Sequence, residues 1–325
     1  MDVIAENSPV STKEDASLTP RLTKARLRHA CYLAFSETTR RAANRRTLGD
    51  LASSPDPTLR ALGLALGEVL DGRLTVEEQS WVDRIEQQRA RLEESRETVS
   101  MARLQPREAT PLRARALLEG TAADTTATAG QTAVVGQICR KASKSRVWGL
   151  VLFKLVRHLR PTTCLEIGTC LGMSAAYEAA ALQVNGAGRL VTVEGIESLA
   201  RLATANLEGL GLTSATVAAG MFEDLWQDIA PDLSPIDFAF IDGSHNPRAT
   251  LLYFDEIEAR MQPGGVVVFD DIHWSKGMNA TWTILQMHPH VTATIDLFDF
   301  GVCVVGRPGK TESHRVGLGL PALKR

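Results

Sequence analysis

Hydrophobic and polar positions follow two different periods along the chain. From about residue 140, short apolar runs alternate with segments whose apolar residues recur at helical spacing, for example Leu199, Leu202 and Leu210. The runs are TCLEIG, RLVTVEG, ATVAAG, IDFAFID, GGVVVFDD, VTATIDLFD and GVCVVGR. This alternation predicts a doubly wound α/β fold, with a mostly parallel seven-stranded sheet covered by helices on both faces. The last two runs have no helix between them, which predicts an antiparallel hairpin at one edge.

The first part of the chain has a helical pattern instead. It is rich in Arg, Glu, Leu and Ala, and Thr75 with Glu78 forms a capping-box pattern before an apolar stripe at helical spacing. Gly, Ala and Thr dominate a later stretch, which is typical of a linker. We therefore expect a disordered tail at 1–17, a helical region at 18–119, a linker at 120–136, the main domain at 137–310 and a C-terminal tail at 311–325.

Composition and charge are those of an ordinary soluble globular protein. Of 325 residues, 44% are hydrophobic and 23% are charged, and the formal net charge is −2, so neither nucleic acid nor a membrane is expected as a partner. The segment 21–46 carries eight Lys/Arg against one Glu, but such runs are more often solvated helix faces. The five scattered cysteines fit a reducing compartment, and the N-terminus shows no export pattern, which favours the cytoplasm.

A glycine-rich turn follows the first predicted strand. Glu166 ends that strand, Gly168 permits a tight turn, and Gly172 and Ser174 lie where the next helix begins. The spacing G-x-x-x-G differs from the G-x-G-x-x-G that seats a dinucleotide pyrophosphate, and an acid at this position would repel one. The same acid can accept hydrogen bonds from an ammonium group, so the turn suits the amino-acid end of S-adenosyl-L-methionine. Glu194, at the tip of the next strand, is placed to accept two ribose hydroxyls, although many strand-end carboxylates only cap a helix.

The motifs LEIGTCLGMSAAY, VTVEG, IDFAFIDGSHN and GGVVVFDDIHW resemble those of class I S-adenosylmethionine-dependent methyltransferases. Within that superfamily they are most similar to catechol-O-methyltransferase-like and macrocin-O-methyltransferase-like enzymes, over about residues 137–308. The resemblance implies a Rossmann-like fold and transfer of a methyl group to a hydroxyl of a small molecule. It also implies that the following residues bind the cofactor: Glu166, Gly168, Thr169, Gly172, Ser174, Glu194, Gly220, Met221, Phe222 and Asp242.

Three carboxylates end two strands that we expect to be neighbours. Asp242 ends one strand, and Asp270 and Asp271 end the other. Carboxylates that converge repel one another unless a positive group lies among them, and Mg²⁺ (or Mn²⁺) prefers oxygen ligands. The resemblance implies the same metal site, although Asp271 stands where the catechol enzymes have Asn. The alternative is that one of Asp270 and Asp271 caps a turn while Asp242 contacts only the cofactor, as in metal-independent relatives.

His245, three residues after Asp242, is the candidate general base, and the pair is the expected catalytic set. A solvent-exposed loop histidine is the alternative. Lys144 and three neighbouring cations before the first strand either attract an anionic acceptor or are simply solvated. Besides a Mg²⁺-assisted O-methyltransferase, we keep a metal-independent O- or N-methyltransferase and a non-catalytic S-adenosylmethionine-binding protein as hypotheses. The N-terminal helices either cover the acceptor pocket or form a homodimer, and we favour the homodimer.

Overall fold

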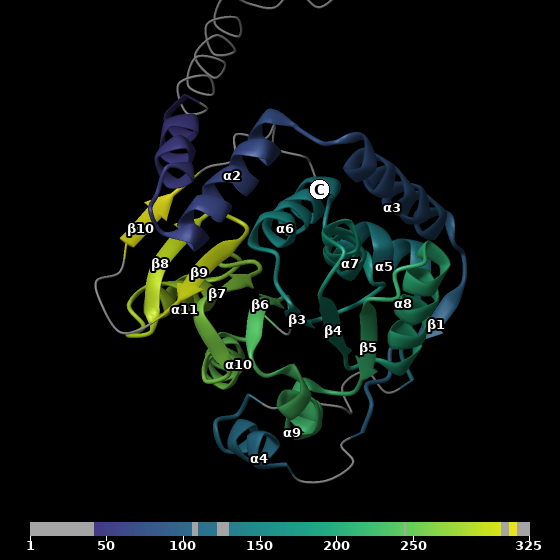
Figure 1. The fold of residues 1–325 in the computed structure, drawn as a ribbon. Helices are drawn as coiled ribbons and strands as arrows, with labels where there is room; N and C mark the ends of the chain where they lie inside the picture. Colours follow the sequence, from purple (N-terminus) through teal and green to yellow (C-terminus); the bar gives the residue numbers. More distant parts are fainter. Residues whose placement is uncertain (1–41, 106–109, 122–129, 244, 307–311, 317–325) are drawn as a thin grey trace, which may run out of the picture. The chain divides into compact units, whose positions relative to one another are not determined.

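A computed structural model describes residues 42–105, 110–121, 130–243, 245–306 and 312–316 (Figure 1). All of them belong to one compact unit, Arg40–Arg325. The expected tail at 1–17 and most of the basic segment 21–46 lie outside the described residues. Among the residues that are described, no helix is both long and apolar enough to cross a membrane.

One large sheet organises the unit and confirms the predicted fold class (Figure 1). Each of the seven apolar runs forms a strand, and β9 is antiparallel to both of its neighbours, β7 and β8, as the hairpin prediction required. The other pairs in this sheet are parallel. From edge to edge the strands are β10 (Glu312–Arg315), β8 (Val291–Asp296), β9 (Gly301–Val305), β7 (Met261–Phe269), β6 (Ile236–Ile241), β3 (Thr163–Ile167), β4 (Arg189–Glu194) and β5 (Ala215–Ala219).

The eighth strand, β10, lies within the segment 311–325 that was expected as a tail; residues 311 and 317–325 lie outside the described residues. Its four residues, ESHR, pair in parallel with β8 at the edge of the sheet. Their side chains are polar and mostly exposed, so the sequence has none of the apolar alternation that indicates a strand. Pairing with β8 makes this segment a strand, and side-chain patterning could not predict it.

Helices cover both faces of the sheet with two separate apolar cores. Side chains of successive strand residues point to opposite faces, so Phe240 joins one core and Ile241 the other. The first core is closed by α6 (Arg146–Leu159), α7 (Met173–Asn185) and α8 (Glu197–Leu210). The second is closed by α4 (Pro111–Leu118), α9 (Phe222–Leu233), α10 (Pro247–Glu258) and α11 (Lys276–Gln286).

The N-terminal helices extend the first core. Residues 42–52 are helical, and they are followed by α2 (Pro57–Asp71) and α3 (Val76–Glu94), whose predicted capping box is present. Lys154 of α6 donates hydrogen bonds of 2.7 Å to both Glu68 of α2 and Glu78 of α3. Amphipathic helices were predicted here, but their buried charged contacts with α6 were not. These contacts make the N-terminal helices part of the same compact unit.

The stretch expected as a linker, 120–136, is only partly described. Its last residues form β2 (Thr132–Val134), which pairs antiparallel with β1 (Thr98–Ser100), and then begin α5 (Val135–Ala142). The strand β1 is the one named strand in the described part of the 18–119 region. The expected boundary at residue 136 therefore falls inside a helix, because the Thr-Ala-Val segment finds a partner strand that lies far back in the sequence.

Candidate active site

The predicted site residues come together at the carboxyl edge of the sheet. Glu166 is the next-to-last residue of β3 and Glu194 ends the adjacent strand β4, while Asp242 and Asp270 follow the adjacent strands β6 and β7. Because β3 also pairs with β6, all four acids belong to one continuous row of strand ends. Ligands of open α/β sheets bind at this edge, so the placement agrees with the sequence-based expectation.

Close packing fixes the turn after β3. Gly168 has a φ of +103°, and a Cβ there would lie 2.2 Å from the carbonyl oxygen of Asp242. Gly172, at the N-cap of α7, has a φ of +79°, and a Cβ there would lie 3.3 Å from the Cβ of Ala203 on α8. Both glycines are therefore required by the protein's own packing, in addition to any ligand that approaches the backbone.

Glu166 is completely buried beneath this turn. Its carboxylate accepts a hydrogen bond from the Thr192 hydroxyl, whose oxygen lies 2.5 Å from that of Thr169. Burial, together with the charge of Glu194, raises the pKa of Glu166 to about 7, although hydrogen bonds from Ser174 and Thr192 oppose the rise. Its Oε1 atom has no hydrogen-bond partner among the described residues. This unpaired oxygen is free to accept a hydrogen bond from a bound cationic group.

Glu194 makes backbone hydrogen bonds with both oxygens. Its carboxylate accepts from the N–H of Cys170 at 2.7 Å and from the N–H of Ile196 at 2.9 Å. Burial raises its pKa, and the nearby positive charge of Arg103 opposes that rise. The segment around Arg103 is held there by a backbone hydrogen bond from Leu104 to Gly195. The acid thus has the capping role weighed from the sequence, and each oxygen keeps a second lone pair that could accept a ribose hydroxyl.

The three expected cofactor-binding residues in the turn after β5 have different environments. The N–H of Gly220 donates to the carbonyl of Glu194, and Met221 is the half-buried N-cap of α9. Phe222, however, is only 2% exposed. Its ring packs against Trp226 and Tyr253 at centroid distances of 4.9 and 4.8 Å. The motif placed Phe222 beside the adenine, but in the structure it belongs to the core.

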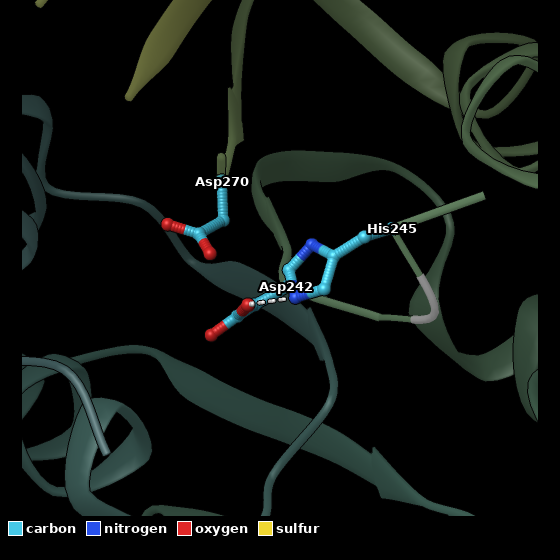
Figure 2. Close-up of side chains that lie close together, drawn as sticks. All are labelled: Asp242, His245 and Asp270. Atoms are coloured by element: carbon cyan, nitrogen blue, oxygen red, sulfur yellow. Dashed lines mark ion pairs between the residues drawn. The ribbon is translucent and has the colours of Figure 1, made fainter. Parts of the chain in front are cut away.

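Asp242, His245 and Asp270 form a compact cluster after β6 and β7 (Figure 2). One potential ligand atom from each of the three lies within 4.8 Å of the others. The His245 Nε2 atom is 3.9 Å from Asp242 Oδ1 and 3.8 Å from Asp271 Oδ2, and the histidine side chain is 35% exposed. Burial, together with the charge of Asp270, raises the pKa of Asp242 well above its ordinary value. Of the three expected carboxylates, Asp242 and Asp270 belong to the cluster, while Asp271 lies beside His245.

Lys144 also reaches this cluster, and sequence reasoning did not place it there. Its Nζ atom lies 3.2 Å from Asp242 Oδ2 and forms a closer ion pair with Asp270 Oδ2. The signal was topological: α6 begins just after Lys144 and leads into β3 through a short turn, so it runs antiparallel to the strand. A 14-residue helix spans about 21 Å, enough to return its N-terminus to the carboxyl edge of the sheet.

A small hollow opens beside the cluster, and two neighbouring residues take different positions. Ile241, Thr250, Tyr253 and Met278 line the hollow together with Gly243, His245 and Asp270. The His273 ring contacts Asn279 and Asp296, at 2.9 and 3.1 Å. Trp274 is 61% exposed, and its ring centroid lies 6.5 Å from that of His245.

Part of the chain matches a known protein family. Residues 165–272 match the family described as "Methyltransferase domain". The structure of an O-methyltransferase from Bacillus cereus in complex with SAH is 26% identical, with a TM-score of 0.45, covering 51% of this chain and 84% of that one. The O-methyltransferase TomG from Streptomyces achromogenes is 26% identical, with a TM-score of 0.43, covering 62% and 92%. A comparison with curated proteins finds no significant match.

None of these TM-scores reaches 0.5, so the family match carries the assignment. It spans β3 to β7, together with the strand-end acids at the carboxyl edge of the sheet. Residues 165–272 are therefore similar to a methyltransferase domain. This confirms the class that the sequence motifs predicted.

Proposed function

We propose that this protein is an S-adenosyl-L-methionine-dependent O-methyltransferase that methylates a hydroxyl group of a small molecule. The observation that carries the proposal is the assembly of Asp242, His245 and Asp270 beside a hollow, within the part of the chain that matches a methyltransferase domain. The similar structures named above are O-methyltransferases with SAH or SAM bound, which supports the same cofactor here.

The cofactor would lie along the ends of β3 and β4. Glu166 Oε1, which has no described partner, would accept a hydrogen bond from the cofactor ammonium, and the N-terminus of α7 would favour its carboxylate. Glu194 would bind the ribose hydroxyls, while Gly220 and Met221 would flank the adenine. Thr169 would act through Thr192, which fixes the Glu166 carboxylate.

His245 would act as the general base. Its Nε2 atom faces Asp242 and Asp271, so both carboxylates favour the imidazolium that forms when a proton is taken from the acceptor hydroxyl. The methyl group of a sulfonium is already activated, so the remaining task of the site is to hold the acceptor oxygen in line with the S–CH₃ bond. The hollow beside His245, lined by Thr250, Tyr253 and Met278, has room for about one water-sized group, so only a small part of the acceptor would enter it.

Mg²⁺ at the acidic rim remains part of this proposal. Asp242 and Asp270, with Asp271 beside them, supply the oxygen donors that Mg²⁺ prefers, and the compact cluster has the dimensions of a cation site. A bound Mg²⁺ would orient the acceptor oxygen and stabilise its negative charge. The ion pair between Lys144 and the same two aspartates is a specific observation in favour of the second candidate, a metal-independent methyltransferase.

Calorimetric titration with S-adenosylhomocysteine tests the cofactor assignment directly. We expect binding to the wild type and at least tenfold weaker binding to Glu194→Gln, which keeps the shape of the side chain but removes its charge. Titration of the product-saturated protein with Mg²⁺ and Mn²⁺, with Asp242→Asn as the control, tests the metal. Absence of S-adenosylhomocysteine binding by the wild type would contradict the proposed cofactor.

Methyl transfer from labelled S-adenosylmethionine to a panel of vicinal diols, catechols and amines tests the acceptor class. The rate of transfer to hydroxyl acceptors should fall by a factor of about 10²–10⁴ in His245→Gln, with S-adenosylhomocysteine binding unchanged. Transfer restricted to amines would refute the O-methyl assignment. Homodimer formation and a cytoplasmic location remain predictions from the sequence.

A further inference from the structure

Lys144 occupies the central position of the acidic rim. Its ammonium group contacts one oxygen of Asp242 and one of Asp270, the two carboxylates that also belong to the candidate metal cluster. The lysine side chain is 15% exposed and that of Asp270 is 1% exposed, so this contact is shielded from solvent. A shielded ion pair of this kind is screened little by salt.

The sequence around Lys144 explains why the ammonium group reaches this point. Lys144 directly precedes Ser145, the N-cap of α6, and α6 is buried along much of its length. The backbone of Lys144 is therefore held by a helix that is itself packed on α2 and α7. Lys141, three residues earlier on α5, is exposed instead. Of the two lysines, only Lys144 is directed to the strand ends.

We propose that Lys144 is the built-in cation of this rim and that divalent metal binds the Asp242–Asp270 pair only in competition with it. Asp242 and Asp270 would hold a metal through their carboxylate oxygens, and the Lys144 Nζ already lies against one oxygen of each. Mg²⁺ binds oxygens at about 2.0–2.1 Å, so a bridging ion and an ammonium on the same oxygens would be in direct contact. Like charges at that distance repel strongly, so metal entry requires the lysine to leave.

The proposal rests on the proposed function only for the identity of the edge as an active site. With Lys144 in place, one positive charge partly compensates the two carboxylates without metal, and His245 can still act as the base. The converging carboxylates need a positive group among them, and Lys144 of this chain supplies it.

The direct test is Mn²⁺ binding to the full chain, measured by calorimetry and by the EPR signal of free Mn²⁺. Lys144→Gln should bind Mn²⁺ at least tenfold more tightly than the wild type. Lys144→Arg, which keeps the charge, should remain as weak as the wild type, and so should Lys141→Gln, which removes one exposed charge nearby. The gain should vanish in Lys144→Gln combined with Asp242→Asn.

Equal or weaker Mn²⁺ binding by Lys144→Gln would overturn the proposal, because it would mean that lysine and metal bind together. A measurement on the wild type covers the case in which the variant does not fold. Amine labelling of Lys144, followed by mass spectrometry, should increase when Mn²⁺ is saturating, because the displaced lysine becomes accessible. Unchanged or reduced labelling would equally overturn it. S-adenosylhomocysteine binding, measured on the same samples, tests the proposed function separately.

Discussion

Replacement of Glu178 by methionine should stabilise this protein, and increasingly so as the pH rises. Glu178 lies on α7, is completely buried, and neither of its carboxyl oxygens has a hydrogen-bond partner among the described residues. Burial, together with the nearby charge of Glu166, raises its pKa well above the ordinary 4.5. The side chain is thus kept neutral in the folded state, and ionisation is unfavourable there.

The sign of the pH dependence follows from linkage. A carboxyl whose pKa is raised by folding is bound to its proton more tightly in the folded state, so stability falls as the pH rises from the unfolded pKa through the folded one. For Glu166, a rise from 4.5 to about 7 corresponds to roughly 3 kcal/mol at higher pH. The pKa of Glu178 is raised as well, so its contribution to stability has the same dependence on pH.

The assay is urea denaturation of the wild type and Glu178→Met at pH 5.5 and pH 8.5. Methionine has a similar volume, and replacing an unpaired buried polar group with an apolar one should add about 2 kcal/mol to the free energy of unfolding near neutral pH. The gain should be larger at pH 8.5 than at pH 5.5. Glu178→Gln, which cannot ionise, should lose the same pH dependence without the apolar gain. If Glu178→Met is less stable at both pH values, then Glu178 is hydrogen-bonded in solution and the reasoning is refuted.

Three further substitutions test the packing of α6 and of its neighbour α2. Lys154→Met leaves Glu78 buried without its ammonium partner and should lower the free energy of unfolding by about 3–5 kcal/mol in urea titrations; a loss below 1 kcal/mol would contradict this. The Lys154 hydrogen bond helps lower the Glu78 pKa against the effect of burial, so the loss should shrink as the pH falls through that lowered pKa. Gly149→Ala would place a Cβ 2.4 Å from the Tyr177 ring and should cost about 1–3 kcal/mol by the same assay. Gly67→Ala, on α2 with nothing within 4 Å, should instead stabilise by up to ~1 kcal/mol.

The sheet and most of its strand-end acids could be predicted because their signals are local. An apolar run indicates a buried strand wherever it lies, and the acid after the run marks the carboxyl edge, as Glu166 and Asp242 show. Burial of Phe222 and the strand formed by ESHR could not be predicted in this way, since each depends on a partner supplied by another part of the chain. The motif suggested a ligand contact for Phe222, whereas the packing of α9 on α10 turns its ring into the core.

The position of Lys144 depends on contacts that the helix α6 makes with the N-terminal helices. Glu68 and Glu78 of the N-terminal helices bind Lys154, and Lys154 lies on the helix that begins just after Lys144. Ten residues of helix span about 15 Å, so a contact in the middle of α6 restricts where its N-terminus can lie. The helical region that precedes the methyltransferase domain is therefore connected to the acidic rim through α6. Its glutamates Glu68 and Glu78 help to hold α6, the helix that begins just after Lys144.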